Sequence, residues 1–188
     1  MAMDPNTGSI LALAGVKHDL ETGEISADAL GTITNVFVPG SVVKAATLTA
    51  GWQYGAISGN QSLVDQPILF AGSTPINSWF TAYGSRSITA VEALEYSSNT
   101  YMVQVALNML GTPYSPNMAL GTHNVDASMK KLRSTFAEYG LGTETGIDLP
   151  TESTGYIPKN FTVSNYITDA FGQFDNYTPL QLAQYAST

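Results

Sequence analysis

Residues 36–47 read Val-Phe-Val-Pro-Gly-Ser-Val-Val-Lys-Ala-Ala-Thr, and this stretch decides how the chain is interpreted. The apolar run at 36–38 is typical of extended structure, which Pro39-Gly40 ends. A helix is expected to begin at Ser41, because no proline or glycine follows before Gly51 and the apolar residues fall on helical spacing. Its small side chains predict a helix that is buried on several sides.

Ser41 and Lys44 are expected on one face of this helix, with Cβ atoms about 5–6 Å apart. A serine hydroxyl is a weak nucleophile at neutral pH and needs a base, and no suitable histidine lies nearby in the sequence. An unprotonated lysine could serve if its pKa fell by roughly 3 units from ~10.4, a differential of about 4 kcal/mol. Burial can supply a shift of that order, and the positive end of the helix favours it. We therefore interpret Ser41 as a candidate nucleophile and Lys44 as its candidate base.

The spacing Ser-x-x-Lys is a weak signal by itself, because it should occur by chance about 0.5 times in such a chain. A second copy runs from Ser128 to Lys131 within an amphipathic helix predicted over 126–139, where the lysine is expected to be a solvated cation. The context of Ser41 differs from that of Ser128. It combines a Pro-Gly entry, a helix start and an apolar run that would bury Lys44.

The triplet Ser97-Ser98-Asn99 falls at a predicted break between two helices, where side chains can point into a cleft. Ser97 could relay a proton there, and the amide of Asn99 offers both a donor and an acceptor for a substrate amide. Two similar triplets, Ser58-Gly59-Asn60 and Ser115-Pro116-Asn117, are interpreted as turn or capping residues. Only a pairing with Ser41 would distinguish 97–99 from them.

The remaining elements follow from turn residues and periodicity. A hairpin is predicted over 1–15 around Asp4-Pro5-Asn6-Thr7-Gly8. Helices are predicted from Ser87 to Tyr96, from Tyr101 to Leu110, over 126–139 and from Leu180 to Tyr185, the last with Thr178-Pro179 at its start. Loops are predicted up to Asn35 and over 141–177, and no element is assigned from Ser58 to Arg86.

The composition describes a folded protein, with 44% hydrophobic and 12% charged residues. A formal net charge of -8 makes nucleic acid an unlikely partner, since phosphate binding needs a concentrated basic surface. The absence of cysteine excludes disulfides and thiol catalysis. His18 and His123 lack metal-ligand spacing, so neither a metal site nor a cofactor is expected. No stretch is long and apolar enough to be a membrane anchor.

Ser-x-x-Lys followed by Ser-x-Asn is a signature of penicillin-binding proteins and class A β-lactamases, and the chain resembles the former over nearly its whole length. Further stretches look like landmarks of the transpeptidase domain: Asp4 to Ala12, Pro39-Gly40-Ser41, Tyr139 to Gly142, Thr145 to Pro150, Phe171-Gly172-Gln173 and Thr178 to Ala183. Residues 41–52 and 95–104 are most similar to the class B, membrane-anchored enzymes of Gram-positive cocci.

The resemblance implies an α/β (α+β) fold, in which helices flank an antiparallel sheet and a helical subdomain is added. It implies a peptidoglycan D,D-transpeptidase in which Ser41 forms an acyl-enzyme with D-Ala-D-Ala stem peptides and is acylated by β-lactams. Lys44 would be the base and Ser97 a proton relay, Asn99 and Ser98 would lie on the substrate side, and the backbone amide of Ser41 would hold part of the oxyanion. Cell-wall synthesis at the outer face of the cell membrane, with cell-division or elongation proteins as partners, is implied with it.

One departure from the family pattern is that no lysine is followed by Thr-Gly or Ser-Gly, the family's third motif. We therefore expect residues 1–188 to be a partial transpeptidase domain, truncated at both ends, with the membrane anchor elsewhere. We expect it to be inactive or nearly so by itself, because the missing strand would pair with the ligand backbone.

Two alternatives share these motifs. A β-lactamase would hydrolyse its acyl-enzyme, but the Glu-x-x-Leu-Asn pattern of class A enzymes is absent from this sequence. A non-catalytic β-lactam-binding sensor could use the same fold without processing peptidoglycan.

Overall fold

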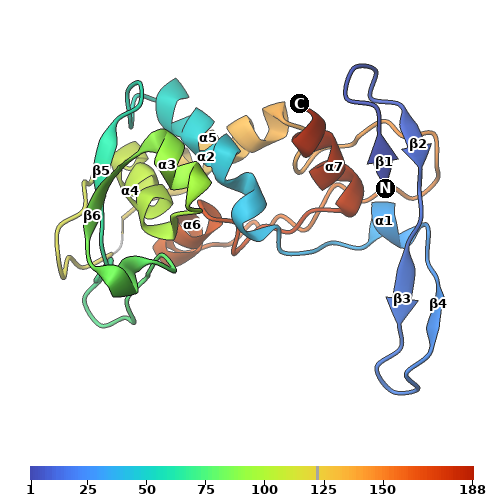
Figure 1. The fold of residues 1–188 in the computed structure, drawn as a ribbon, viewed down its shortest axis with the longest axis horizontal. Helices are drawn as coiled ribbons and strands as arrows, with labels where there is room; N and C mark the ends of the chain where they lie inside the picture. Colours follow the sequence, from blue (N-terminus) through green and yellow to red (C-terminus); the bar gives the residue numbers. More distant parts are fainter. Residues whose placement is uncertain (122) are drawn as a thin grey trace. The chain divides into compact units, whose positions relative to one another are not determined.

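The computed structural model describes residues 1–121 and 123–188 and has a mixed α/β architecture. Its named strands pair as three separate two-stranded antiparallel sheets (Figure 1). The chain divides into two compact units. One comprises residues 40–135 and 158–174, and the other comprises 1–39, 136–157 and 175–188. The expected α/β class with antiparallel strands is confirmed.

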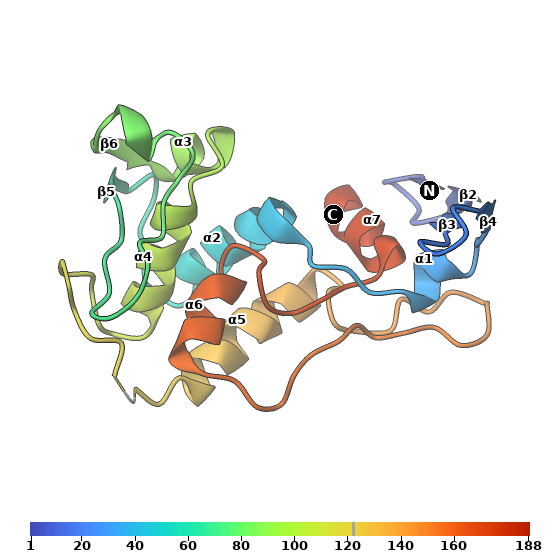
Figure 2. The same ribbon diagram turned by 90° about the horizontal axis from the view of Figure 1, so that it is seen from below.

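The unit that contains residues 40–135 is built around helix α4 (Asn99–Met109), which contacts α2, α3, α6 and strand β5 (Figure 2). Nearly every residue of α4 is buried, including the polar Thr100 and Gln104, and Gln104 donates to the carbonyls of Val64 and Thr100. The other elements of this part of the chain are η1 (Gly40–Val43), α2 (Lys44–Gln53), β5 (Ser62–Asp65), η2 (Thr81–Tyr83), β6 (Arg86–Thr89), α3 (Ala90–Glu95), α5 (Asp126–Glu138) and α6 (Val163–Asp169).

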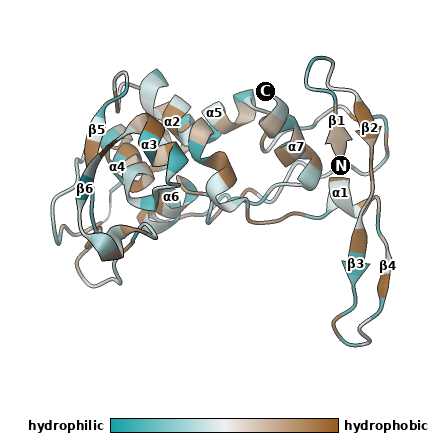
Figure 3. Cartoon of the chain, viewed as in Figure 1, coloured by the Kyte–Doolittle hydropathy of each residue, from teal (hydrophilic) through white to brown (hydrophobic). Residues whose placement is uncertain are grey.

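The other unit joins two hairpins to two helices. Strands β1 (Ala2–Met3) and β2 (Ile10–Ala12) form the first hairpin, and β3 (Val16–His18) and β4 (Ile25–Ala27) form the second. Helix α7 (Pro179–Ser187) contacts both α1 (Gly31–Thr34) and β1. Hydrophobic residues on β2 and β4 stand out in Figure 3, and Leu11 and Ile25 among them are exposed.

Several predicted elements are confirmed with small changes in their bounds. The first hairpin, α4, α5 and α7 lie where they were expected, and the helix from Ser41 begins with a 3-10 turn before α2. Thr178 caps α7 through a capping box with Gln181, and Pro179 occupies the first turn. Helix α2 is buried on several sides, as its small residues predicted.

Other predictions were wrong. The predicted loop before Asn35 contains the β3–β4 hairpin and α1, while β5 lies between Ser58 and Arg86, where no element was assigned. Residues 86–89 form β6, so Ile88 lies in a strand and the helix begins only at Ala90. The predicted loop over 141–177 contains α6, which starts at a capping box between Thr162 and Asn165. These are all short elements, which give a weak periodic signal.

Among residues 1–121 and 123–188, no helix combines the length and apolar composition that crossing a bilayer requires.

Candidate active site

Ser41 lies in the 3-10 turn that precedes α2, and its side chain is exposed. The turn is held by Gly40, which has φ 59° and donates its amide to the carbonyl of Gly172 at 2.9 Å. A Cβ atom on Gly172 would lie 2.0 Å from the oxygen of Gly40, so only glycine fits at this approach. The Phe171-Gly172-Gln173 landmark therefore packs directly against the start of the helix that carries Ser41.

Lys44 begins α2, and its side chain is only 2% exposed. Its Nζ donates hydrogen bonds to the Ser97 carbonyl at 2.7 Å, the Ser97 Oγ at 3.0 Å and the Asn99 Oδ1 at 2.7 Å. Burial lowers the pKa of the Lys44 amine to about 8, and the negative charge of Asp65 offsets part of this by raising it. A lowered pKa is what a lysine needs if it is to act as a base.

The segment that receives the Lys44 amine is the break between α3 and α4. Ser97 has φ 54°, a left-handed conformation that is strained for a residue with a Cβ atom. This conformation lets both the carbonyl and the hydroxyl of Ser97 reach the same amine. Backbone strain of this kind is found at functional sites, where the surrounding structure holds it in place.

Asn99 is the first residue of α4 and is half-buried. Its Oδ1 accepts from Lys44, and its Nδ2 donates to the Asn77 carbonyl at 3.1 Å. The amide is therefore held at both ends. Because Nδ2 carries two hydrogens, the bond to Asn77 uses one of them.

Ser98 lies differently from its neighbours, because it is completely buried. Its hydroxyl donates to Asp65 Oδ2 and accepts from the Tyr101 amide at 3.0 Å. Ser78 donates to the same carboxylate oxygen at 2.8 Å. The geometry therefore supports a structural part for Ser98 rather than the substrate contact expected from its motif.

Asp65, Ser78 and Thr100 lie beside residues 97–99 but belong to neither sequence motif. The one available signal was Asp65 itself, a carboxylate that directly follows Leu63-Val64 at a position that turns out to be buried in β5. Nothing local to Ser78 marks it as a partner of residues 98–100.

The other copies of the two motifs lie at positions where their residues pack within the fold or form turns. Ser128 is buried and donates to the Met109 carbonyl at 3.4 Å, while Lys131 lies 5.1 Å over the ring of Tyr54. Asn117 and Gly59 of the two other triplets have φ 60° and 51°, as turn residues do.

Within the described residues, no cluster of His, Asp and Glu could hold a metal ion, and His18 is an exposed residue of β3.

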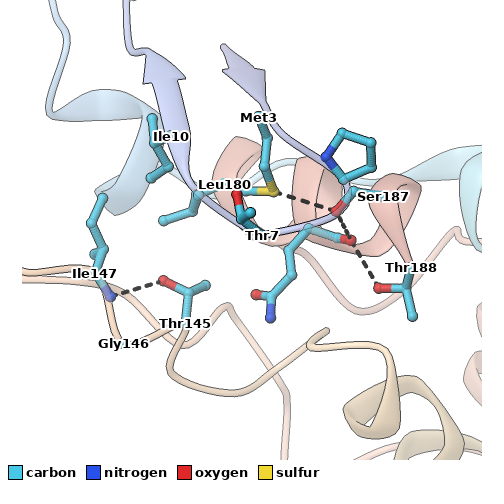
Figure 4. Close-up of a pocket in the computed structure, with 12 residues that line it drawn as sticks. Met3, Thr7, Ile10, Thr145, Gly146, Ile147, Leu180, Ser187 and Thr188 are labelled. Carbon is cyan, nitrogen blue, oxygen red and sulfur yellow. Dashed lines mark hydrogen bonds between the residues drawn. The ribbon is translucent and has the colours of Figure 1, made fainter.

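A cavity of about 550 Å³ lies between the β1–β2 hairpin, residues 145–147 and α7 (Figure 4). On its wall, Ser187 donates to the sulfur of Met3 at 3.3 Å, and Thr145 accepts from the amide of Ile147. The side chains that line it include no ionisable group, so it offers no acid or base. It contains none of the candidate site residues.

The comparison with protein families gives one clear result, since the penicillin-binding protein transpeptidase domain matches residues 1–188. The chain belongs to this transpeptidase family. It is 67% identical over 189 residues to penicillin-binding protein 2B of Streptococcus pneumoniae, covering 100% of this chain and 28% of that protein. The resemblance to class B enzymes of Gram-positive cocci is thereby confirmed.

More distant relatives agree with this membership of the transpeptidase family. Penicillin-binding protein H of Bacillus subtilis is 44% identical over 98% of this chain and 26% of its own length. The peptidoglycan D,D-transpeptidase FtsI of Escherichia coli is 31% identical over 99% of the chain and 29% of its own length. The chain thus spans less than a third of these relatives.

A solved structure of penicillin-binding protein 2B from S. pneumoniae strain 5204 superposes with a TM-score of 0.96 at 65% identity. It covers 99% of this chain, which corresponds to 31% of that structure. That structure therefore shares this arrangement of helices and short antiparallel strands.

Proposed function

We propose that this chain supplies the nucleophile and the base of a serine peptidoglycan D,D-transpeptidase. One observation carries the proposal. A buried lysine amine of lowered pKa lies one turn after an exposed serine and is held by residues 97 and 99. The names of the relatives, which include a peptidoglycan D,D-transpeptidase, support the same reaction.

The hydrogen bonds of Lys44 suggest how its proton moves. An ammonium group has three donors, and the two oxygens of Ser97 and the Oδ1 of Asn99 satisfy all three. A neutral amine has only two donors and a lone pair. Of the three acceptors, only the Ser97 hydroxyl can reverse and donate to that lone pair, so Ser97 is the natural relay.

At pH 7 a pKa of about 8 leaves roughly one-tenth of Lys44 neutral, which is enough for a general base. With its lone pair turned to Ser41 instead of Ser97, the neutral amine takes the proton of Ser41 as Oγ attacks the carbonyl carbon of the penultimate D-Ala. The C–N bond then breaks, the proton passes through Ser97 to the leaving nitrogen, and the last D-Ala departs. The amine of a neighbouring stem peptide resolves the acyl-enzyme, and the released Ser41 hydroxyl recovers a proton.

A β-lactam would follow the first half of this sequence. Ser41 would open the strained ring amide, and the leaving nitrogen would stay attached to the acyl group. The second N–H of Asn99 Nδ2 would orient the ligand amide, and the backbone amide of Ser41 would hold part of the oxyanion. Ser98 is too deeply buried to contact a ligand in this scheme.

Residues 1–188 would act as part of a larger transpeptidase domain at the outer face of the cell membrane. Peptidoglycan stem peptides are its proposed substrates, and cell-division or elongation proteins are its proposed partners. Cross-linking of peptidoglycan through Ser41 would give the protein a role in cell shape. Acylation of the same serine by β-lactams would give it a role in β-lactam resistance.

The test uses a full-length protein that contains these residues, incubated with benzylpenicillin and analysed by peptide mass spectrometry. A covalent adduct is expected on the peptide that holds Ser41 and should disappear in the Ser41→Ala variant. An adduct that persists for hours distinguishes a transpeptidase from a β-lactamase, which would release it within seconds. An adduct on another residue would contradict the proposal, and a Ser41→Ala protein that still cross-links stem peptides would favour the non-catalytic sensor.

A further inference from the structure

The side chain of Asp65, at the end of β5, is a fully buried carboxylate beneath the 97–99 break. Its Oδ2 accepts from the hydroxyls of Ser78 and Ser98, while its Oδ1 has no hydrogen-bond partner. Arg86 is its neighbour across the β5–β6 ladder, but its guanidinium lies over two aromatic rings, 4.3 Å from Phe80 and 4.5 Å from Tyr96. The two serine hydroxyls are thus what holds this carboxylate.

These two hydroxyls also cap α4. Ser78 Oγ accepts from the amides of Asn99 at 3.1 Å and Thr100 at 3.3 Å, and Ser98 Oγ accepts from Tyr101 at 3.0 Å. Each hydroxyl has one hydrogen, and both hydrogens go to Asp65. The serine oxygens are therefore left with their lone pairs facing the first three amides of the helix. A negative charge at this end also complements the helix dipole.

The capped turn is the same segment that holds the candidate base. The backbone amide of Asn99 donates to Ser78, and the side-chain Oδ1 of the same residue accepts from Lys44. Ser97, which directly precedes the buried Ser98, supplies the other two acceptors. We propose that Asp65 is a positioning residue: through Ser78 and Ser98 it fixes the start of α4, and with it the three oxygens that hold Lys44. This inference rests on the proposed function of Lys44 as the base.

The charge of Asp65 has a second, separable effect on Lys44, because it raises the pKa that burial lowers. Other ionisable groups lie on the neighbouring elements: Glu95 of α3 is exposed, and three more have partners of their own. Glu92 of α3 bonds to Thr89, Arg86 of β6 lies over aromatic rings, and the Tyr101 hydroxyl of α4 donates to the Gln61 carbonyl. Among the residues that the structure describes, Asp65 is the charged group that acts on the pKa of Lys44.

The experiment compares Asp65→Asn and Asp65→Ala with the unsubstituted protein, in a full-length protein that contains these residues. The asparagine oxygen can still accept from both serines, so this variant keeps the cap and removes the charge. The alanine variant removes both. Asp169→Asn is the matched control, because Asp169 is an equally buried aspartate of the same unit, on α6. The acylation rate by benzylpenicillin is measured against pH for each, and circular dichroism checks folding.

In Asp65→Asn the acid limb of the pH profile should move to lower pH, since the pKa of Lys44 loses the charge that raised it. The Asp169→Asn profile should keep its midpoint. Asp65→Ala should lose about 10- to 100-fold in the plateau rate, because the acceptors of Lys44 are no longer held in place. A merely structural role of Asp65 would lower rates without moving the midpoint.

An unchanged midpoint in Asp65→Asn would contradict the charge effect alone. A folded Asp65→Asn variant that loses the plateau rate, or a folded Asp65→Ala variant that keeps it, would overturn the proposal. Either result would leave the proposed function intact, because the unsubstituted protein would still be acylated on Ser41. Absence of any adduct on Ser41 in the unsubstituted protein would instead overturn the proposed function, and this inference with it.

Discussion

The Nζ atom of Lys44 and the Oδ1 atom of Asn99 lie 2.7 Å apart, although 55 positions separate the two residues in the chain. This contact joins the start of α2 to the start of α4, and it brings the Ser-x-x-Lys and Ser-x-Asn motifs into one site. Together with the two bonds to Ser97, it holds the buried lysine amine at the break between α3 and α4.

Acylation of Ser41 should depend on the protonation of Lys44. Below its pKa of about 8 the amine is charged and cannot accept a proton, so the rate should rise about tenfold per pH unit. Above that pH the rate should level off. Stopped-flow measurement of penicillin acylation between pH 5.5 and 10, in the full-length protein, checks this. A profile that is flat through pH 8 would argue against lysine as the base.

Lys44→Arg should keep a positive charge at the site but lose the base, because a guanidinium does not give up its proton at these pH values. We expect the acylation rate to fall by about 10²- to 10⁴-fold, the usual contribution of general-base catalysis. Lys130→Arg, on the exposed face of α5, is the matched control and should acylate normally. Near-normal acylation of Lys44→Arg would mean that another group takes the proton.

Burial of Lys44 should also make stability depend on pH. The pKa of Lys44 is about 8 in the folded chain against 10.5 for the free group, so between these values the unfolded chain binds more protons. The penalty is fully present below pH 8 and is relieved as pH rises toward 10.5. Relative to Lys44→Met, the unsubstituted protein should gain at most about 3 kcal/mol over this range.

Urea unfolding at pH 7.5 and 10.5 measures this difference in the free energy of unfolding. Lys130→Met provides the reference, since Lys130 is exposed and should show no comparable change with pH. Equal pH dependence in the Lys44→Met and Lys130→Met proteins would mean that the Lys44 amine is not desolvated in solution.

Ser98→Ala should destabilise the unit that contains α4. It removes the cap on the Tyr101 amide and one of the two donors to the buried Asp65 carboxylate. We expect a loss of about 1–3 kcal/mol in the free energy of unfolding. Ser164→Ala, an exposed position in the first turn of α6, should change it by less than about 0.5 kcal/mol. If both variants unfolded at the same urea concentration, the network around Asp65 would contribute little.

Local signals in the sequence were enough for some of the structure. Pro39-Gly40 and the helical spacing after Ser41 predicted α2, and Thr178-Pro179 predicted the start of α7, because caps and turns depend on neighbours in the chain. The same kind of signal at Thr162 and Asn165 marks α6, but asparagine in place of glutamate or glutamine made that capping box hard to recognise. Strand β5 escaped prediction because its buried position is occupied by a carboxylate.

By itself, the sequence determined that a lysine follows Ser41 by one turn at the start of a helix, because that spacing is a property of the helix alone. Only the tertiary structure decided that the Lys44 amine is buried, that it binds Ser97 and Asn99, and that Ser98 faces Asp65 instead of a ligand. The physical reason is that desolvation by distant segments and the charge of Asp65 set the pKa of Lys44. Those segments meet only when β5, α2 and α4 pack together.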